Sequence, residues 1–89
     1  MKVEFKASFL KDIGKIRTKN TLKRVKAIIE YIESTDDLRS ISELKKLKGG
    51  GGNYYRIRVE DYRIGLSITK SKCIFVRCLD RKEIYRYFP

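Results

Sequence analysis

The sequence predicts an α+β fold, in which an N-terminal pair of helices (an αα-hairpin) packs on one twisted, mainly antiparallel sheet of four strands. Three observations predict this class. Apolar residues recur with a helical period between residues 9 and 32, whereas they alternate with polar residues at residues 1–5 and from residue 54 onward. Three strand-like runs then follow one another through short turns, which is typical of an antiparallel meander. The 89 residues suffice for one hydrophobic core, so we expect a single domain over residues 1–89.

The N-terminal third is predicted to form a short strand and two amphipathic helices. Residues 1–5 alternate Met, Val and Phe with Lys and Glu, which indicates a strand. A helix should follow with Ser8 as its N-cap and apolar side chains at positions 9, 10, 13 and 16. A second helix is expected to open at Thr21, after a turn near Lys19 and Asn20. Its apolar stripe consists of Leu22, Val25, Ile28, Ile29 and Ile32.

Residues 34–52 are predicted to contain a short helix followed by an irregular loop. The segment STDD, residues 34–37, ends the second helix, and leucine or isoleucine then recurs at positions 38, 41, 44 and 47. This spacing predicts a short helix or 3₁₀ turn, with Ser40 and Glu43 spaced as a capping box. In KKLKGGGG, residues 45–52, four successive glycines predict a mobile loop edged by lysines. No G-x-x-x-x-G-K-[ST] pattern is present, so we do not expect a nucleotide site there.

The C-terminal half is predicted to form three strands. In residues 54–59 the apolar side chains Tyr55, Ile57 and Val59 share one face, and the other face carries Tyr54, Arg56, Arg58 and Glu60. A tight turn at residues 60–61 leads into a second alternating run, and KSK at residues 70–72 forms the next turn. The last strand, residues 73–79, is almost continuously apolar, as a central strand should be. Its two cysteines, five residues apart, should point to opposite faces and remain unpaired.

The charge of the chain limits the classes of partner. Twenty-two Lys and Arg against eleven Asp and Glu give a net charge of +11, which favours nucleic acid, an acidic protein or an anionic membrane surface. No apolar run approaches the roughly 20 residues that span a bilayer, and acidic residues stand where a signal peptide would be apolar. We therefore expect a cytoplasmic protein. With no histidine and only two cysteines, a zinc site is not expected.

Arginine and tyrosine are concentrated on the polar face of the predicted hairpin. Arg56 and Arg58 should lie about 6 to 7 Å apart on one side of a strand. Solvent-exposed arginines that pair with neighbouring acids would explain this segment alone. The C-terminal DRKEIYRYFP, residues 80–89, however, brings more basic and aromatic side chains to one end of the sheet. Guanidinium groups bind phosphate oxygens and tyrosine rings stack on unpaired bases, so the combination predicts a site for single-stranded RNA.

Two segments also resemble a known family. KLKGGGGNYYRIRVEDYRIGL and IFVRCLDRKEIYRYF are similar to the RelE/ParE superfamily of toxins from type II toxin–antitoxin modules. The resemblance rests on a Y-[KR]-[IL]-[KR]-[VL] strand, the Y-R that follows and an R…[ED]-[IV]-Y ending, and it covers essentially the whole chain. It implies a four-stranded sheet with two helices packed against it. It also implies a toxin that a proteic antitoxin neutralises.

The RelE-like branch of this superfamily consists of ribosome-dependent endoribonucleases that cut mRNA in the ribosomal A site without a metal or other cofactor. The resemblance to this branch implies a catalytic set of Arg56, Arg58, Arg63, Arg81 and Tyr85. Arg63 and Arg58 would hold the scissile phosphate, Arg81 would stabilise or protonate the leaving 5′-oxygen, and Tyr85 would stack on a base. Contacts to RNA or the ribosome are expected from Lys45, Lys46, Lys48, Lys82 and Arg86.

One position departs from this branch. Familiar members have a lysine where this chain has Arg56, and an arginine, with a pKa above about 12, is a poor general base. Other branches use histidine or glutamate, and this chain has no histidine. Glu60, Glu83, Asp80 or a ribosomal group could accept the proton instead, so the general base stays unassigned.

Two other functions fit the resemblance and the charge. The ParE-like branch shares the fold and inhibits DNA gyrase, but its members generally lack the full set of phosphate-binding residues. A non-catalytic RNA-binding module is the third possibility. In each toxin branch an acidic, partly disordered antitoxin is the expected protein partner, and it would fold on the basic surface as it binds.

Overall fold

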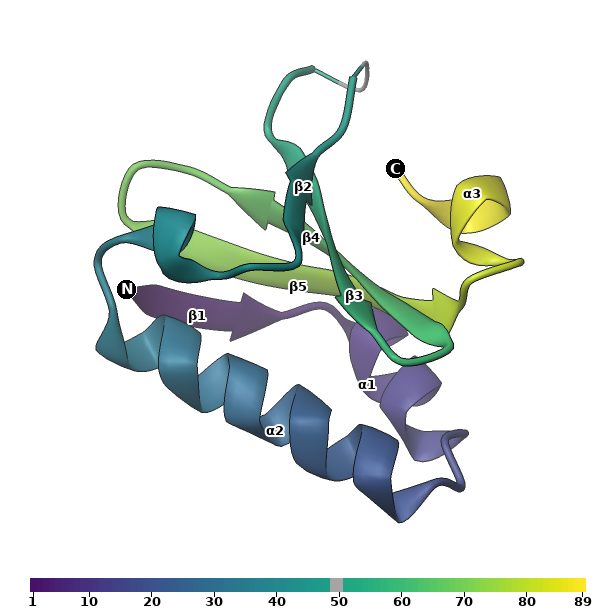
Figure 1. Cartoon of the computed structure of the whole chain (residues 1–89). Helices are drawn as coiled ribbons and strands as arrows, with labels where there is room; N and C mark the ends of the chain where they lie inside the picture. Colours follow the sequence, from purple (N-terminus) through teal and green to yellow (C-terminus); the bar gives the residue numbers. More distant parts are fainter. Residues whose placement is uncertain (49–50) are drawn as a thin grey trace.

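The computed structural model describes residues 1–48 and 51–89 of the chain. The elements, in chain order, are β1 (Lys2–Phe5), α1 (Ala7–Gly14), α2 (Lys19–Ser34), the 3₁₀ turn η1 (Leu38–Ser40), β2 (Leu44–Lys46), β3 (Tyr54–Val59), β4 (Tyr62–Ile68), β5 (Lys72–Asp80) and α3 (Ile84–Tyr87). Helices α1 and α2 lie along one side of the sheet and α3 lies on the other (Figure 1). Among the described residues, no helix is long and apolar enough to cross a membrane.

The sheet is mainly antiparallel, as predicted, but it has five strands rather than four. Its order is β1-β5-β4-β3-β2; β1 runs parallel to β5 and every other pair is antiparallel. The additional strand is β2, which begins in the predicted short helix at Leu44 and continues into the predicted loop at Lys45 and Lys46. The predicted short helix is present as η1 but ends at Ser40. Leu44 then pairs with Ile57, because the edge of β3 offers backbone partners that a local sequence pattern does not reveal.

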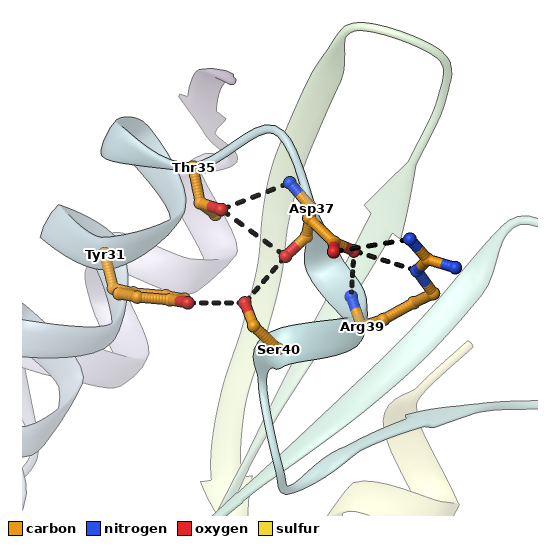
Figure 2. Close-up of polar contacts among 5 residues, drawn as sticks. All are labelled: Tyr31, Thr35, Asp37, Arg39 and Ser40. Atoms are coloured by element: carbon orange, nitrogen blue, oxygen red, sulfur yellow. Dashed lines mark hydrogen bonds and ion pairs between the residues drawn. The ribbon is translucent and has the colours of Figure 1, made fainter.

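Hydrogen bonds fix the connection between α2 and β2 (Figure 2). The carboxylate of Asp37 accepts hydrogen bonds from the Arg39 backbone N–H and side-chain Nε, each at 3.0 Å. Ser40 Oγ donates to the Asp37 carbonyl at 2.7 Å and also bonds to the Tyr31 hydroxyl of α2. Asp37, rather than Ser40, therefore caps the short helix, and the predicted capping box of Ser40 and Glu43 is wrong. Glu43 is therefore not a helix-capping residue, and it immediately precedes β2.

Both N-terminal helices begin earlier in the chain than predicted. Helix α1 starts at Ala7, and the hydroxyl of Ser8 donates to the Val76 carbonyl of β5 at 2.6 Å. Helix α2 starts at Lys19, so the turn between the helices spans residues 15–18 and Thr21 is buried in the first helical turn. The two helices also pack on different strands, α1 on β5 and α2 on β1 and β3. The predicted helix pair is present, but the sheet sets its geometry.

The core lies between the two helices and the sheet. Phe9 of α1 packs against Phe75 of β5, with ring centroids 5.3 Å apart, and both side chains are fully buried. Branched aliphatic side chains from α2, β3 and β4 complete this layer: Val25, Ile32, Ile57, Val59, Ile64 and Leu66. The apolar stripe of the second helix therefore packs on the core as expected, whereas in the first predicted stripe Leu10 is 58% exposed and Ile16 lies beyond the end of α1.

The two cysteines lie on the same face of β5, contrary to the prediction. In the β4–β5 pair Gly65 opposes Arg77 while Leu66 opposes Phe75, so Val76 is an extra, unpaired residue. This β-bulge shifts the alternation by one residue and turns both Cys73 and Cys78 into the core. They are free thiols, and burial raises the pKa of each to about 12, so they are neutral near pH 7.

Asp12 of α1 lies against the part of β5 that β1 does not cover. Strand β1 pairs with residues 72–75 only. Beyond them, the buried Asp12 carboxylate accepts hydrogen bonds from the Cys78 backbone N–H at 3.0 Å and from Arg77 Nε and Nη2 at 2.8 and 3.1 Å. The Asp12 side chain therefore gives the Cys78 backbone N–H the acceptor that a neighbouring strand would otherwise supply. It also forms an ion pair with the partly buried Arg77.

The predicted loop at residues 45–52 is only partly irregular. Lys45 and Lys46 belong to β2, whereas Gly51 and Gly52 have φ of 91° and 89°, a left-handed conformation that glycine adopts easily. Residues 49 and 50 lie outside the described part of the chain.

Candidate functional site

Three arginines meet on the face of the sheet opposite α1 and α2. Arg58 of β3 lies directly across from Arg63 of β4, and Arg56 lies across from Gly65. Because residues paired across strands point to the same face, the hairpin brings all three guanidinium groups together. They line a hollow of about 430 Å³, which we call the arginine hollow; its other lining residues are Ser42, Glu43, Leu44 and Lys45.

Strand β2 and the residue that precedes it contribute side chains of both charges to the arginine hollow. Lys45 pairs with Arg56, and the Arg58 N–H donates to the Glu43 carbonyl at 3.5 Å, which places Glu43 opposite Arg58. Among the described residues that line the hollow, Glu43 is the only one with a carboxylate. The sequence interpretation missed it because it assigned Glu43 to a helix cap. Had residues 43–46 been recognised as a strand, the alternation would have placed Glu43 and Lys45 on one face.

Tyr85 extends the site from α3. The Arg56 guanidinium donates a hydrogen bond to the Tyr85 hydroxyl and lies over its ring, with Cζ 4.9 Å from the ring centroid. A guanidinium group over an aromatic face gains both electrostatic attraction and contact area. The Tyr85 side chain is nevertheless 70% exposed, so much of the ring is accessible to a ligand. The site therefore combines cations with an accessible aromatic surface.

Helix α3 is held over the sheet by an aromatic side chain that needs a glycine below it. The buried Phe88 ring lies on Gly65, where an added Cβ would stand 2.6 Å from the ring carbons Cγ and Cδ2. Phe88 also meets the Tyr54 ring edge-on, with centroids 5.5 Å apart. Gly65 is therefore required for close approach of α3 to the sheet, and it indirectly positions Tyr85 over Arg56.

Gly65→Ala should push Phe88 and α3 away from the sheet. We expect the free energy of unfolding to fall by about 1–3 kcal/mol, because the added Cβ would overlap the Phe88 ring and displace it from its buried position. Urea unfolding measures the loss, and the chemical shifts of the Tyr85 ring report whether its contact with Arg56 persists. Ser67→Ala, on the same face of the same strand, is the matched control. A Gly65→Ala protein with wild-type stability and Tyr85 shifts would contradict this role.

Arg63 is anchored by the hairpin turn that precedes it. Its Nη1 donates to the carbonyl of Glu60 at 2.9 Å and to the carbonyl of Tyr62 at 2.8 Å. Arg63 also lines the arginine hollow. Anchoring at one end leaves the Nε–H and Nη2–H donors, which are suited to bidentate contact with a phosphate.

The remaining predicted site residues are not among those that line the hollow. The backbone of Arg81 donates to the Asp61 carbonyl at 2.8 Å, so Arg81 lies beside the turn next to Arg63 with an exposed side chain. Lys48, Lys82 and Arg86 are also exposed. Lys46 pairs with Tyr55 and lines a different, largely apolar pocket with Leu38 and Ile41, so it points to the other face of the sheet.

None of the three carboxylates named as candidate bases lines the arginine hollow. Glu60 was predicted to share the arginine face, but its Oε1 accepts a hydrogen bond from Thr21 Oγ1 of α2 at 2.8 Å. Asp80 and Glu83 line a separate hollow of about 360 Å³, together with Arg77 and Tyr87. Tertiary structure thus directs Glu60 toward the helices and leaves Glu43 among the arginines.

Comparisons with known proteins find relatives over nearly the whole chain. A family model described as the ParE toxin of the type II toxin–antitoxin system parDE matches residues 3–85. The chain is 46% identical over 94 residues to Toxin RelE3 of Methanocaldococcus jannaschii, and the match covers 100% of both proteins.

Solved structures show the same fold. A chain of the RelB–RelE antitoxin–toxin complex from Methanococcus jannaschii matches with a TM-score of 0.83 and 42% identity, over 97% of this chain and 99% of that chain. A chain of the archaeal RelE–RelB complex from Pyrococcus horikoshii OT3 matches with a TM-score of 0.73 over 90% and 93% of the two chains; at 22% identity it supports the fold alone. The predicted resemblance is confirmed: the chain belongs to the RelE/ParE superfamily of type II toxin–antitoxin toxins.

Proposed function

We propose that this toxin is a ribosome-dependent endoribonuclease that cleaves mRNA in the ribosomal A site and so inhibits translation. The observation that carries this proposal is the arginine hollow, in which three guanidinium groups and one carboxylate converge beside an exposed tyrosine ring. Cations suit a phosphodiester and the ring suits an unstacked base.

The reaction is attack of a ribose 2′-OH on the adjacent phosphorus. The 2′-oxygen–phosphorus bond forms, the bond to the 5′-oxygen breaks, and the products are a 2′,3′-cyclic phosphate and a 5′-hydroxyl. Charge develops on the phosphoryl oxygens in the transition state, where Arg58 and Arg63 stabilise it more than they stabilise the ground state. Arg81, beside the same turn, stabilises or protonates the leaving 5′-oxygen, and Tyr85 stacks on a base to align the strand.

Glu43 is the general base in this proposal. A carboxylate oxygen can accept the 2′-OH proton, whereas a guanidinium group is a poor proton acceptor. Arg56, which occupies the position of the expected lysine, has a different role: its hydrogen bond and stacking contact hold Tyr85 over the site. The 2′-OH proton passes to Glu43, and the leaving 5′-oxygen takes a proton from Arg81 or from a water molecule that Arg81 orients.

The proposed function is tested by primer extension on a defined mRNA incubated with the purified toxin. Cuts should appear at codon-phased positions with programmed ribosomes and be absent without them. The same preparation should leave the supercoiling activity of DNA gyrase unchanged. The match to a ParE model makes gyrase inhibition the second candidate; intact mRNA together with lost supercoiling would establish it and exclude the nuclease.

Glu43→Gln should reduce the single-turnover cleavage rate by about 10²-fold, because general base catalysis typically contributes 10²- to 10⁴-fold. The amide keeps the size of the side chain, so the free energy of unfolding should stay the same. Glu30→Gln, on the exposed surface of α2, is the matched control and should cleave like the wild type. Full activity of Glu43→Gln would remove Glu43 from the chemistry while leaving the nuclease assignment intact.

We also propose that an acidic antitoxin binds this toxin. The net charge of +11 favours such a partner, and the relatives from M. jannaschii and P. horikoshii were solved as complexes with RelB. Lys45 and the arginines of the hollow would serve both the antitoxin and ribosomal RNA, which makes the two partners competitors for one surface.

A further inference from the structure

The orientation of Arg63 depends on a hairpin turn with an unusual backbone. Both hydrogens of Arg63 Nη1 are directed to carbonyls of this turn, those of Glu60 and Tyr62. Glu60 has a φ of 55°, a left-handed conformation that is sterically unfavourable for a residue with a Cβ atom. Something must stabilise this conformation, since it sets the direction of the carbonyl that Arg63 binds.

Helix α2 supplies that stabilisation. Thr21 is 2% exposed, and its hydroxyl donates to Glu60 Oε1 at 2.8 Å. Arg24 approaches Glu60 Oε2 at 3.8 Å, but both side chains are exposed enough that this ion pair contributes little. The hydrogen bond from Thr21 therefore connects a buried position on one face of the sheet to the turn that anchors Arg63 on the other.

We propose that Thr21 and Glu60 are positioning residues for Arg63. Through the Glu60 carbonyl they hold Nη1 against the turn, so that the Nε and Nη2 donors face the arginine hollow as a preformed bidentate site for the scissile phosphate. This inference rests on the proposed nuclease function. It assigns Glu60 a role that does not require its negative charge, unlike the role of a general base.

Four variants distinguish the effect of the Thr21–Glu60 hydrogen bond from the effect of the negative charge of Glu60. Thr21→Val and Glu60→Ala remove the bond, whereas Thr21→Ser and Glu60→Gln retain a donor and an acceptor at the same places. We expect the first pair to lower kcat by about 10- to 100-fold with little change in KM, because the contact that they misplace acts mainly in the transition state. The second pair should cleave at nearly the wild-type rate. Thr18→Val, an exposed threonine without a capping bond, is the matched control.

A second measurement shows whether the loss passes through Arg63. In the Arg63→Ala background, Thr21→Val should cause no further loss of cleavage, whereas a general structural defect would reduce the rate again. The proposal is overturned if Thr21→Val cleaves like the wild type, if its loss is unchanged in the Arg63→Ala background, or if Glu60→Gln is inactive.

An activity-independent readout tests the anchoring itself. In the free toxin, NMR signals of the Arg63 guanidinium should report slow rotation in the wild type and faster rotation in Thr21→Val. If the wild-type toxin leaves ribosome-bound mRNA intact, the proposed function fails, and these signals alone decide the anchoring. Arg63 signals that are identical in the wild type and Thr21→Val would then overturn it.

Discussion

Cleavage of ribosome-bound mRNA by the Arg63→Ala variant is expected to fall by about 10²- to 10³-fold, the loss that follows removal of one donor to a developing oxyanion. The structure gives the physical reason. Arg63 lines the hollow, and two carbonyls hold its Nη1, so its remaining donors are oriented before the substrate binds. Preorganised charge costs no reorganisation during the reaction, which is why one side chain has a large effect.

Single-turnover primer extension measures this loss, and two variants make it specific. Arg17 is an exposed arginine between α1 and α2, and it is not among the residues that line the hollow. Arg17→Ala removes the same charge and should cleave like the wild type. Arg63→Lys keeps the charge but loses the planar fork, so it should recover only part of the activity. If Arg63→Ala and Arg17→Ala lost activity to the same extent, total charge rather than this guanidinium group would drive cleavage. If Arg63→Ala cleaved like the wild type, Arg63 would have no role in cleavage.

Asp12→Ala is expected to lower the free energy of unfolding by about 2–4 kcal/mol. The substitution leaves the Cys78 N–H without its acceptor at the uncovered edge of β5, and it removes the partner of Arg77, whose side chain is 26% exposed. For a domain of this size, the midpoint of thermal unfolding should fall by roughly 10–30 °C. Circular dichroism during heating measures this shift.

Partial replacements identify the source of the Asp12 effect. Asp12→Asn can still accept from the Cys78 N–H but loses the charge opposite Arg77, so its loss should be intermediate. In an Arg77→Met background, Asp12→Ala should cost less than in the wild type, because the two residues interact directly. If Asp12→Ala lowered the free energy of unfolding by less than about 1 kcal/mol, Asp12 would not be a main source of stability at this edge of β5.

Much of the candidate site was accessible from the sequence, because it depends on alternation within one hairpin. Arg56 and Arg58 lie two residues apart on a strand, and a two-residue turn sets Arg63 opposite Arg58. The C-terminal tyrosine was identified from the family resemblance, and the structure brings it to Arg56. Glu43 was missed because its partner strand is distant in sequence and local spacing favoured a helix.

The sequence by itself determined the elements whose periodicity is strong: the two N-terminal helices, the β3–β4 hairpin and the central strand β5. In each of them the hydrophobic pattern and the local backbone preference agree. Tertiary structure alone decided what lies between them. The edge of β3 recruited β2, a bulge at Val76 turned both cysteines into the core, and Gly65 admitted Phe88 so that α3 could cover the sheet. These features depend on backbone partners and on space contributed by residues far away in the chain, which no local pattern records.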